Sequence, residues 1–370
     1  MQRRKLGKTN EDVSILGLGG FHLVEISTKD AVWLVNRYLD EGGNYVEVAP
    51  LYGNGESEIK IGKVMKNRRE ECLLASKCHL REEDKAIELL DESLMRLRTD
   101  HLDLWFMHAV NTYEDWARVN SPRGALRAAE RAKKEGKIRY IAISGHRPEV
   151  LIDAIKDYPF DAVMGVINYY DKFNFPLIED VLIPLAKEKN MGIIAMKALA
   201  DGFLWKSAEN AFRYTLSLPV TTVVVGFNTK EMLEKDLRIF NSFTPMSEEE
   251  KENLFRNAPE LGNYVCRLCG KCLPCPENID IPKIFNLEGY YDRQMLYGEI
   301  KDPADYALRD RLRFWFGNEN LARERYKKLK VKATACTKCG ECEPRCPYNI
   351  PIIEKLKIAD YKLGGETRVF

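Results

Sequence analysis

The residues of this sequence with the clearest chemical meaning are its cysteines. Eight of the ten fall into two short runs, which read Cys266-x2-Cys269-x2-Cys272-x2-Cys275-Pro276 and Cys336-x2-Cys339-x2-Cys342-x3-Cys346-Pro347. Thiolates at this spacing, with a proline after the fourth cysteine, are typical ligands of four-iron four-sulfur clusters. The two runs therefore predict two such clusters.

The runs resemble those of bacterial two-cluster ferredoxins, in which the fourth cysteine of each run binds the other cluster. The pattern assigns one cluster to Cys266, Cys269, Cys272 and Cys346, and the second to Cys336, Cys339, Cys342 and Cys275. Zinc and disulfides are the alternatives. Zinc gives no reason for two four-cysteine runs that each close in Cys-Pro, and disulfides need an oxidising compartment, for which we find no export signal.

The composition is that of an ordinary globular protein. The 370 residues are 45% hydrophobic and 31% charged, which favours two or three domains and no membrane span. We expect the chain to stay in a reducing cytoplasm. A formal net charge of +1 provides no field for holding nucleic acid, so we expect no nucleic-acid partner.

Before the first cysteine run, short apolar stretches alternate with amphipathic ones at intervals of roughly 30 residues, as in repeated strand–helix units. The segment 84–98 is one amphipathic stretch, with leucine and isoleucine at three- and four-residue steps. The expected strands are 15–19, 44–48, 72–76, 102–107, 138–143, 162–167, 192–196 and 221–225. Eight strands joined by helices predict an α/β fold, a (β/α)8 barrel of the TIM type.

The sequence predicts two domains, a barrel over residues 1–258 and a mainly α-helical, ferredoxin-like iron–sulfur domain over 259–370. Near the boundary we expect one helix led by Thr229 and another capped by Ser247. The segment between the cysteine runs is expected to be helical, and its aromatic residues include Tyr290, Tyr291, Phe314, Trp315 and Phe316.

Polar residues gather where several of the expected strands end. Glu47 ends the second strand, with Tyr52 just beyond it, Lys77 ends the third and His108 ends the fourth. Barrels of this kind hold their chemistry at the carboxyl ends of the strands. We therefore expect a carboxylate, a phenol, an ammonium and an imidazole to meet at one mouth.

The segment from Gly43 to Glu58 resembles the Asp-Thr-Ala-x-x-Tyr-Gly signature of the aldo-keto reductase family, in particular its branch with a C-terminal ferredoxin-like domain. The likeness extends from the Lys5-Leu6-Gly7-Lys8-Thr9 hairpin to about Leu237 and includes the cysteine domain. It implies a catalytic tetrad of Glu47, Tyr52, Lys77 and His108, which would reduce a carbonyl to an alcohol, or the reverse, with NAD(P)H. Tyr52 would act as the general acid and base, and we expect the Lys77 ammonium to lower its pKa.

The same resemblance implies a set of cofactor-binding residues, namely Ser144, Gly145, Met164, Met196, Gly226, Asn228, Thr229 and Lys230. Several positions depart from the family. Glu47 replaces an aspartate, so we expect its longer side chain either to displace Lys77 or to turn aside. Gly145 replaces an asparagine and Met164 a glutamine, which removes two expected hydrogen bonds to the nicotinamide carboxamide.

Three functions stay open at this point. The first is an iron–sulfur aldo-keto reductase acting on a small carbonyl or alcohol. The second is an electron-transfer oxidoreductase whose barrel holds flavin or another cofactor, linked through the clusters to an external ferredoxin-like carrier. An intermediary is needed because nicotinamide moves two electrons and each cluster takes one. The third is a non-catalytic redox sensor or scaffold.

Overall fold

The computed structural model describes residues 1–295 and 318–365, which fall into two compact units. The first, here the barrel unit, comprises Met1–Ile167, Leu177–Ala198 and Phe212–Pro245. The second, here the cysteine unit, comprises Asn168–Pro176, Leu199–Ala211 and the chain from Met246 onward. The expected boundary after residue 258 falls inside the cysteine unit and stays a prediction.

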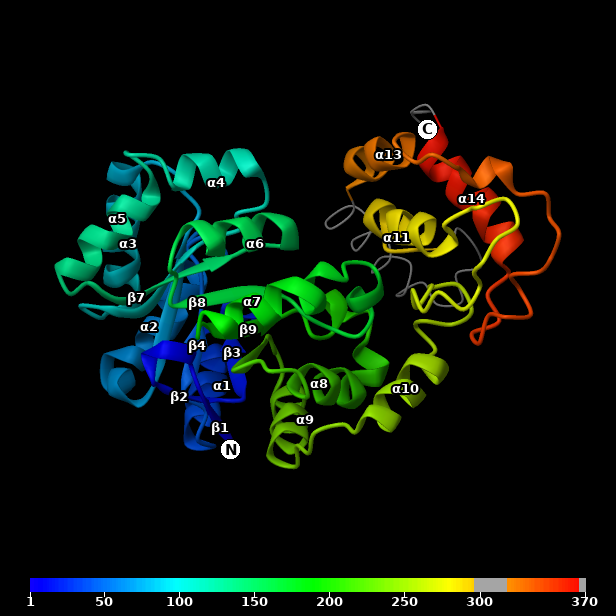
Figure 1. Cartoon of the computed structure of the whole chain (residues 1–370). Helices are drawn as coiled ribbons and strands as arrows, with labels where there is room; N and C mark the ends of the chain where they lie inside the picture. Colours follow the sequence, from blue (N-terminus) through cyan, green and yellow to red (C-terminus); the bar gives the residue numbers. More distant parts are fainter. Residues whose placement is uncertain (296–317, 366–370) are drawn as a thin grey trace. The chain divides into compact units, whose positions relative to one another are not determined.

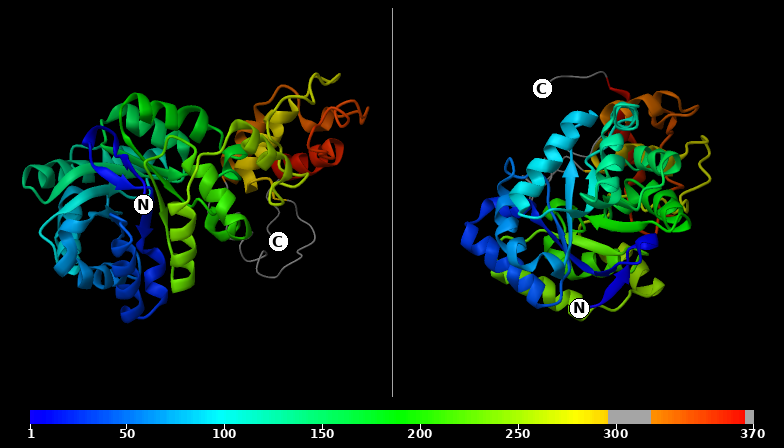
Figure 2. Two further views of the ribbon diagram at one scale, coloured as in Figure 1. Left: turned by 90° about the horizontal axis from the view of Figure 1, so that it is seen from below. Right: turned by 90° about the vertical axis from the view of Figure 1, so that its left-hand side faces the viewer.

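The barrel predicted from the sequence is confirmed (Figures 1 and 2). Every neighbouring pair of strands is parallel, and the ring closes where β10 pairs with β3. The strands are β3 (Leu16–Gly19), β4 (Tyr45–Glu47), β5 (Leu73–Cys78), β6 (Leu102–Met107), β7 (Ile138–Ser144), β8 (Ala162–Val166), β9 (Gly192–Met196) and β10 (Thr222–Val225). A hairpin of β1 (Arg3–Lys5) and β2 (Asp12–Ser14) precedes them.

Helices follow the strands because the intervening sequence is amphipathic. In α3 (Glu83–Leu97), the residues Ala86, Leu90, Leu94 and Leu97 recur on one face and are buried. The other helices of the barrel region are α1 (Thr28–Asp40), α2 (Glu56–Arg68), α4 (Tyr113–Val119), α5 (Ala125–Lys134), α6 (Pro148–Asp157), α7 (Ile183–Glu188), α8 (Ala208–Leu216) and α9 (Lys230–Asn241). Thr229 caps α9, as expected, by accepting a hydrogen bond from the Met232 amide.

The interior of the barrel is filled by every second residue of its strands. Tyr45 of β4, Ala75 of β5 and Phe106 of β6 belong to one buried cluster with residues of the other strands. Because side chains alternate between the two faces of a strand, the residue two positions further along each strand also points inward. This alternation determines which side chains reach the mouth of the barrel.

The cysteine unit contains four described helices, α10 (Glu248–Asn257), α11 (Ile281–Asp292), α13 (Glu319–Lys327) and α14 (Ile352–Gly364). Ser247 and Glu250 form the capping box that begins α10. Tyr290 and Tyr291 lie in α11, as the sequence predicts, whereas Phe314, Trp315 and Phe316 lie outside the described residues.

Residues 168–176, which follow β8, also belong to the cysteine unit, and a buried ion pair holds them there. The Arg293 guanidinium lies 2.7 Å from the Asp171 carboxylate, and both side chains are about 1% exposed. The Gln294 side chain, beside Arg293, accepts a hydrogen bond from the Cys266 amide at 2.7 Å. It donates a second hydrogen bond to the Asn174 side chain at 3.2 Å. A continuous path of hydrogen bonds therefore joins the first cysteine run to residues 168–176 within the cysteine unit.

None of the helices in the described ranges is long and apolar enough to cross a membrane.

Candidate functional site

The alternation of the barrel strands brings three of the expected catalytic residues to one level. Glu47 stands two residues after Tyr45, Lys77 two after Ala75 and His108 two after Phe106, so each continues an inward-facing series. β4 pairs with β5 and β5 with β6, which makes the three side chains neighbours around the ring. The apolar core below them gives way to a polar layer at the carboxyl ends.

Tyr52 joins this layer from the turn between β4 and α2. The Tyr52 amide donates to the Ala49 carbonyl at 3.0 Å, and Gly53 and Gly55 follow with φ values of 62° and 90°. These left-handed conformations suit glycine and turn the chain sharply into α2. Tyr52 is thereby held over the end of β4.

Lys77 is the centre of the site. Its Nζ lies 2.9 Å from the Tyr52 hydroxyl, donates to the Val48 carbonyl at 3.2 Å and forms an ion pair with the Glu47 carboxylate. The Glu47 side chain thus reaches Lys77, which stays within hydrogen-bond distance of Tyr52, and the expected effect of its extra length stays a prediction. Glu47 and Lys77 are almost completely buried, so their interaction is poorly screened by solvent.

Two aromatic rings pack against the phenol ring of Tyr52. The His108 ring packs edge-on at 6.3 Å between centroids, and the Phe21 ring packs edge-on at 5.2 Å. The His108 amide donates to the Cys78 carbonyl at 2.9 Å, which continues the pairing of β6 with β5. Within the described residues, Nδ1 of His108 is buried and has no hydrogen-bond partner.

Burial dominates the electrostatics of these side chains. It raises the pKa of Tyr52 above its usual value and lowers the pKa of Lys77 well below the usual range for lysine. Burial, followed by the charge of Lys77, also lowers the pKa of His108 well below its usual value. Our expectation that Lys77 lowers the pKa of Tyr52 is therefore wrong in direction, because desolvation of the phenolate outweighs the nearby amine.

Three residues around His108 escaped the sequence analysis. His79 lies two positions after Lys77. Its Nδ1 is buried and has no hydrogen-bond partner in the described part of the chain. Arg81 donates to the carbonyls of His108 and Ala109 at 2.9 and 3.2 Å. The Asn111 side chain accepts a hydrogen bond from the His146 amide at 2.7 Å. The position of His79 just after a strand-end lysine was a usable signal.

The residues expected to bind nicotinamide lie at the ends of β7 and β9 and in the middle of β8. The Ser144 hydroxyl accepts the Ala109 amide at 3.2 Å, and Met164 is buried in the barrel core. A Cβ on Gly145 would lie 2.6 Å from the Val110 carbonyl oxygen. The asparagine that the family places here does not fit this backbone, which explains the substitution.

The expected phosphate-binding segment after β10 is held by residues that follow β3. Asn228 donates to the Glu25 carboxylate at 2.7 Å, and Nζ of Lys230 lies 4.5 Å from the centre of the Trp33 ring. A Cβ on Gly226 would lie 2.4 Å from the ring of His22. Asn228 and Lys230 are thus both engaged with protein groups.

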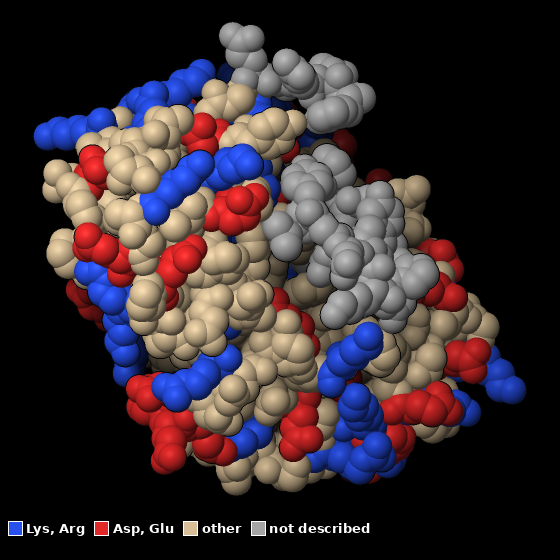
Figure 3. Space-filling view, turned by 90° about the vertical axis from the view of Figure 1, so that its right-hand side faces the viewer, with Lys and Arg blue, Asp and Glu red and all other residues tan. Residues whose placement is uncertain are grey.

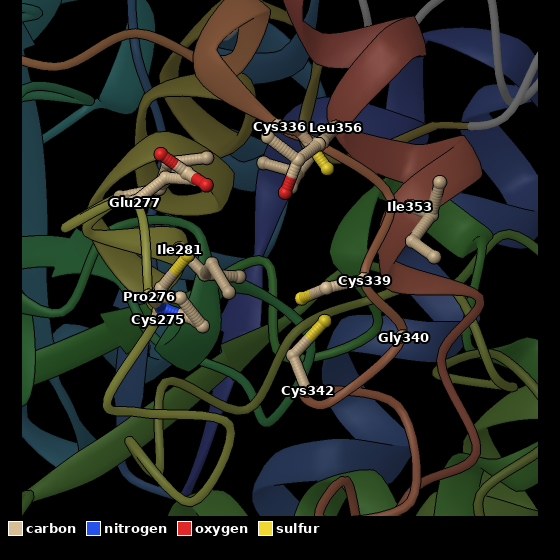
Figure 4. Close-up of a pocket in the computed structure, with 12 residues that line it drawn as sticks. Cys275, Pro276, Glu277, Ile281, Cys336, Cys339, Gly340, Cys342, Ile353 and Leu356 are labelled. Carbon is tan, nitrogen blue, oxygen red and sulfur yellow. The ribbon is translucent and has the colours of Figure 1, made fainter.

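The eight cysteines of the two runs line two neighbouring cavities. Cys266, Cys269, Cys272 and Cys346 line the first, and Cys275, Cys336, Cys339 and Cys342 line the second, with Ile281 common to both. Figure 4 shows Cys275 on one side of the second cavity and the three cysteines of the other run around it. The fourth cysteine of each run thus lines the cavity of the other run.

Comparisons with known proteins agree with both parts of the chain. Residues 15–210 match the profile of the Aldo/keto reductase family, and residues 265–351 match that of a 4Fe-4S dicluster domain. The uncharacterized oxidoreductase YqkF of Bacillus subtilis is 32% identical over 216 residues, which cover 55% of this chain and 67% of that protein. The L-galactose dehydrogenase of Arabidopsis thaliana is 28% identical over 219 residues, with coverages of 55% and 67%.

Among solved structures, an aldo-keto reductase of Bacillus halodurans in its holo form superimposes with a TM-score of 0.61 at 25% identity, covering 69% of this chain and 95% of that chain. Fold, strand-end residues and cysteine runs together define an iron–sulfur oxidoreductase built on a (β/α)8 barrel. The chain belongs to the aldo/keto reductase family and carries a 4Fe-4S dicluster domain.

Proposed function

We propose that this chain reduces a carbonyl compound to an alcohol with NAD(P)H as the hydride donor, or catalyses the reverse reaction with NAD(P)+ as the hydride acceptor. The observation that carries the proposal is the 2.9 Å contact between Nζ of Lys77 and the Tyr52 hydroxyl at the mouth of the barrel. Glu47 pairs with Lys77 from the neighbouring strand, and the His108 ring lies beside Tyr52. NAD(P)H, when bound, would supply the hydride.

The residues of the tetrad would hold the proton and transfer it to the substrate oxygen. Burial keeps the proton on the Tyr52 oxygen at neutral pH, so the hydroxyl can donate to a carbonyl oxygen as charge develops there. Lys77 then donates a hydrogen bond to the resulting phenolate, and Glu47 holds Lys77 in place. His108 stays neutral at neutral pH, because burial lowers its pKa, and it limits the directions in which the phenol can turn.

Cofactor and substrate sites are proposed from the resemblance to the family. Ser144, Gly145, Met164 and Met196 would face the nicotinamide, and Gly226, Asn228, Thr229 and Lys230 the phosphates. The hydroxyl of Ser144 is the one polar side chain among the first four. The name of the Arabidopsis relative, a dehydrogenase of L-galactose, supports a small polar alcohol or carbonyl compound as the substrate class.

The two cysteine-lined cavities are proposed to hold the two [4Fe–4S] clusters, with one ligand exchanged between the runs. Among the described residues, no group of three or more His, Cys, Asp or Glu side chains is placed to hold a single metal ion. Four thiols spread around a cavity suit the corners of a cluster better than one zinc ion, which needs all four at a single point. The iron–sulfur domain is proposed to begin near residue 259.

The clusters are proposed to exchange electrons with an external carrier. Cys269 and Cys339 are exposed, so each cavity has one ligand near solvent. On the face in Figure 3, basic and acidic side chains of the described residues are interspersed. Recognition of a carrier would then depend on local contacts around the two cavities more than on a large field of one sign.

Replacing Tyr52 tests the catalytic proposal. Tyr52→Phe should abolish NAD(P)H-dependent reduction of a panel of aldehydes and ketones, while the visible absorption of the clusters stays unchanged. Tyr361→Phe, at a tyrosine that is 67% exposed, is the matched control and should keep full activity. Reduction by the Tyr52→Phe protein at the wild-type rate would refute the assignment.

A second candidate, favoured by the buried Met164 where the family has a glutamine, is electron transfer through a flavin in the barrel. It requires a bound yellow chromophore besides the clusters in protein purified without oxygen. Denaturation in acid releases non-covalent flavin for identification by its fluorescence. Its absence, together with carbonyl reduction by NAD(P)H, would leave the first proposal alone.

A further inference from the structure

A buried cation lines the cavity of Cys266, Cys269, Cys272 and Cys346, here called the Cys266 cavity. The Arg267 side chain is 6% exposed and donates to the carbonyls of Phe255 at 3.0 Å and Gly262 at 2.8 Å, and also to the Val265 carbonyl. Its guanidinium lies 4.7 Å from the centre of the Tyr348 ring, which lines the same cavity. The hydrogen bonds that Arg267 donates within the described ranges all go to backbone carbonyl oxygens, a fourth being that of Leu261 at 3.3 Å.

The charge at the other cavity has the opposite sign. Cys275, Cys336, Cys339 and Cys342, which define the Cys336 cavity, share its lining with Glu277, labelled in Figure 4. Among the described residues lining the two cavities, Glu277 is the one carboxylate of the Cys336 cavity and Arg267 the one basic side chain of the Cys266 cavity. Glu343 lies next to Cys342 in the chain and accepts the Ile353 amide at 3.0 Å.

A second cation, Lys355, lies near the Cys266 cavity. Its Nζ lies 4.8 Å from the centre of the Phe285 ring, and Phe285 lines this cavity.

Lys355 alone does not set the net charge. It belongs to a buried group with Glu288, Lys362 and Asp292, joined by ion pairs of 2.6 to 2.9 Å. Two ammonium groups and two carboxylates sum to zero, so their effect at a distance is that of a dipole. Arg267, whose partners are neutral carbonyls, therefore supplies the unbalanced positive charge.

Reduction adds one negative charge to a cluster, so a fixed nearby cation favours reduction and a fixed carboxylate opposes it. We propose that Arg267 and Glu277 set the two clusters to different potentials, so that an electron entering the pair resides at equilibrium on the cluster in the Cys266 cavity. This inference rests on the proposed assignment of [4Fe–4S] clusters to the two cavities. When one electron passes from the cluster in the Cys336 cavity to the cluster in the Cys266 cavity, the first cluster is oxidised by one electron and the second is reduced by one electron.

The test is a redox titration of the holoprotein with dithionite under anaerobic conditions, followed by electron paramagnetic resonance. Wild-type protein should show two separate midpoints. Arg267→Gln should lower the higher midpoint by roughly 59 mV for one electron. At a fixed potential, this shift lowers the reduced-to-oxidised ratio of that cluster about tenfold. Glu277→Gln should raise the lower midpoint and leave the higher one in place.

Two further variants separate charge from structure. Arg267→Lys keeps the charge and should restore most of the wild-type midpoint. Lys271→Gln, which removes an exposed charge from the same cysteine run, should change either midpoint far less, because solvent screens it. If Arg267→Gln does not fold, the wild-type midpoints and Glu277→Gln still decide the question.

A single shared midpoint in wild-type protein, or loaded variants in which Arg267→Gln and Glu277→Gln leave both midpoints unchanged, would overturn the inference. So would a downward shift of the lower midpoint in Arg267→Gln. Failure of the wild-type chain to bind close to eight irons would instead contradict the assignment of the clusters. The two failures are therefore distinguishable by iron analysis of the same sample.

Discussion

The Tyr52 hydroxyl lies 2.9 Å from Nζ of Lys77, although 25 residues separate the two along the chain. One comes from the turn after β4 and the other from the end of β5, and the parallel pairing of these strands brings them together. Glu47 forms an ion pair with the same amine, and its Oε1 lies 3.5 Å from the Tyr52 hydroxyl. This arrangement leads to the following predictions.

Lys77→Met should lower kcat for carbonyl reduction by about 100-fold or more, the usual contribution of a positioned proton-transfer group. The phenolate of Tyr52 would lose its hydrogen-bond donor, while methionine keeps most of the buried volume. Steady-state rates with a saturating carbonyl substrate measure the effect. Lys66→Met, at an exposed lysine of α2, is the control. A Lys77→Met protein with near wild-type kcat would contradict the proposed role.

Neither Tyr52 nor His108 should give the pH dependence of carbonyl reduction an inflection between about pH 6 and 9. Burial raises the pKa of Tyr52 above the usual value of about 10, so its acid form is present throughout this range and is lost only at higher pH. Burial lowers the pKa of His108, so its neutral form is also present throughout. A profile of kcat against pH tests this. An acidic limb near pH 6.5 that disappears in His108→Asn would show that His108 takes up a proton in that range.

Cys346→Ala should remove the cluster of the first cysteine run, although Cys346 belongs to the second. It lines the cavity with Cys266, Cys269 and Cys272, so its loss leaves that cluster with three thiols. We expect the iron content to fall by about half. Cys72→Ala is the control, because this buried cysteine lines neither cavity, and its iron content should stay at the wild-type level. Loss of only the Cys336 cluster in Cys346→Ala would show that the fourth ligands are not exchanged.

Gly145→Asn, which restores the family's residue, should destabilise the barrel unit rather than improve catalysis. The added Cβ would lie 2.6 Å from the Val110 carbonyl oxygen, and backbone at that distance has to move. Thermal unfolding followed by tryptophan fluorescence should show a lower midpoint. Gly165→Ala is the matched control, since its nearest contact would be an ordinary 3.6 Å. An unchanged midpoint with a lower KM for NAD(P)H would contradict this account.

Local patterns in the sequence were sufficient for the architecture and for the candidate residues. Apolar stretches at regular spacing predicted all eight barrel strands, because strand formation and burial follow the local run of side chains. The positions of Glu47, Lys77 and His108 at strand ends predicted their meeting, since parallel strands of one barrel end at one rim. The cysteine spacing predicted which four thiols line each cavity.

Quantities that depend on burial and long-range contact were outside the reach of that reasoning. The pKa of Tyr52 moves upward because desolvation outweighs Lys77, and the spacing of residues does not measure desolvation. Residues 168–176 belong to the cysteine unit through Asp171 and Arg293, which are 122 positions apart. The opposite charges beside the two cavities arise because folding places Arg267, bonded to carbonyls, in the lining of one cavity and Glu277 in the lining of the other. Sequence determines which groups exist, but their free energies depend on the neighbours that folding brings to them.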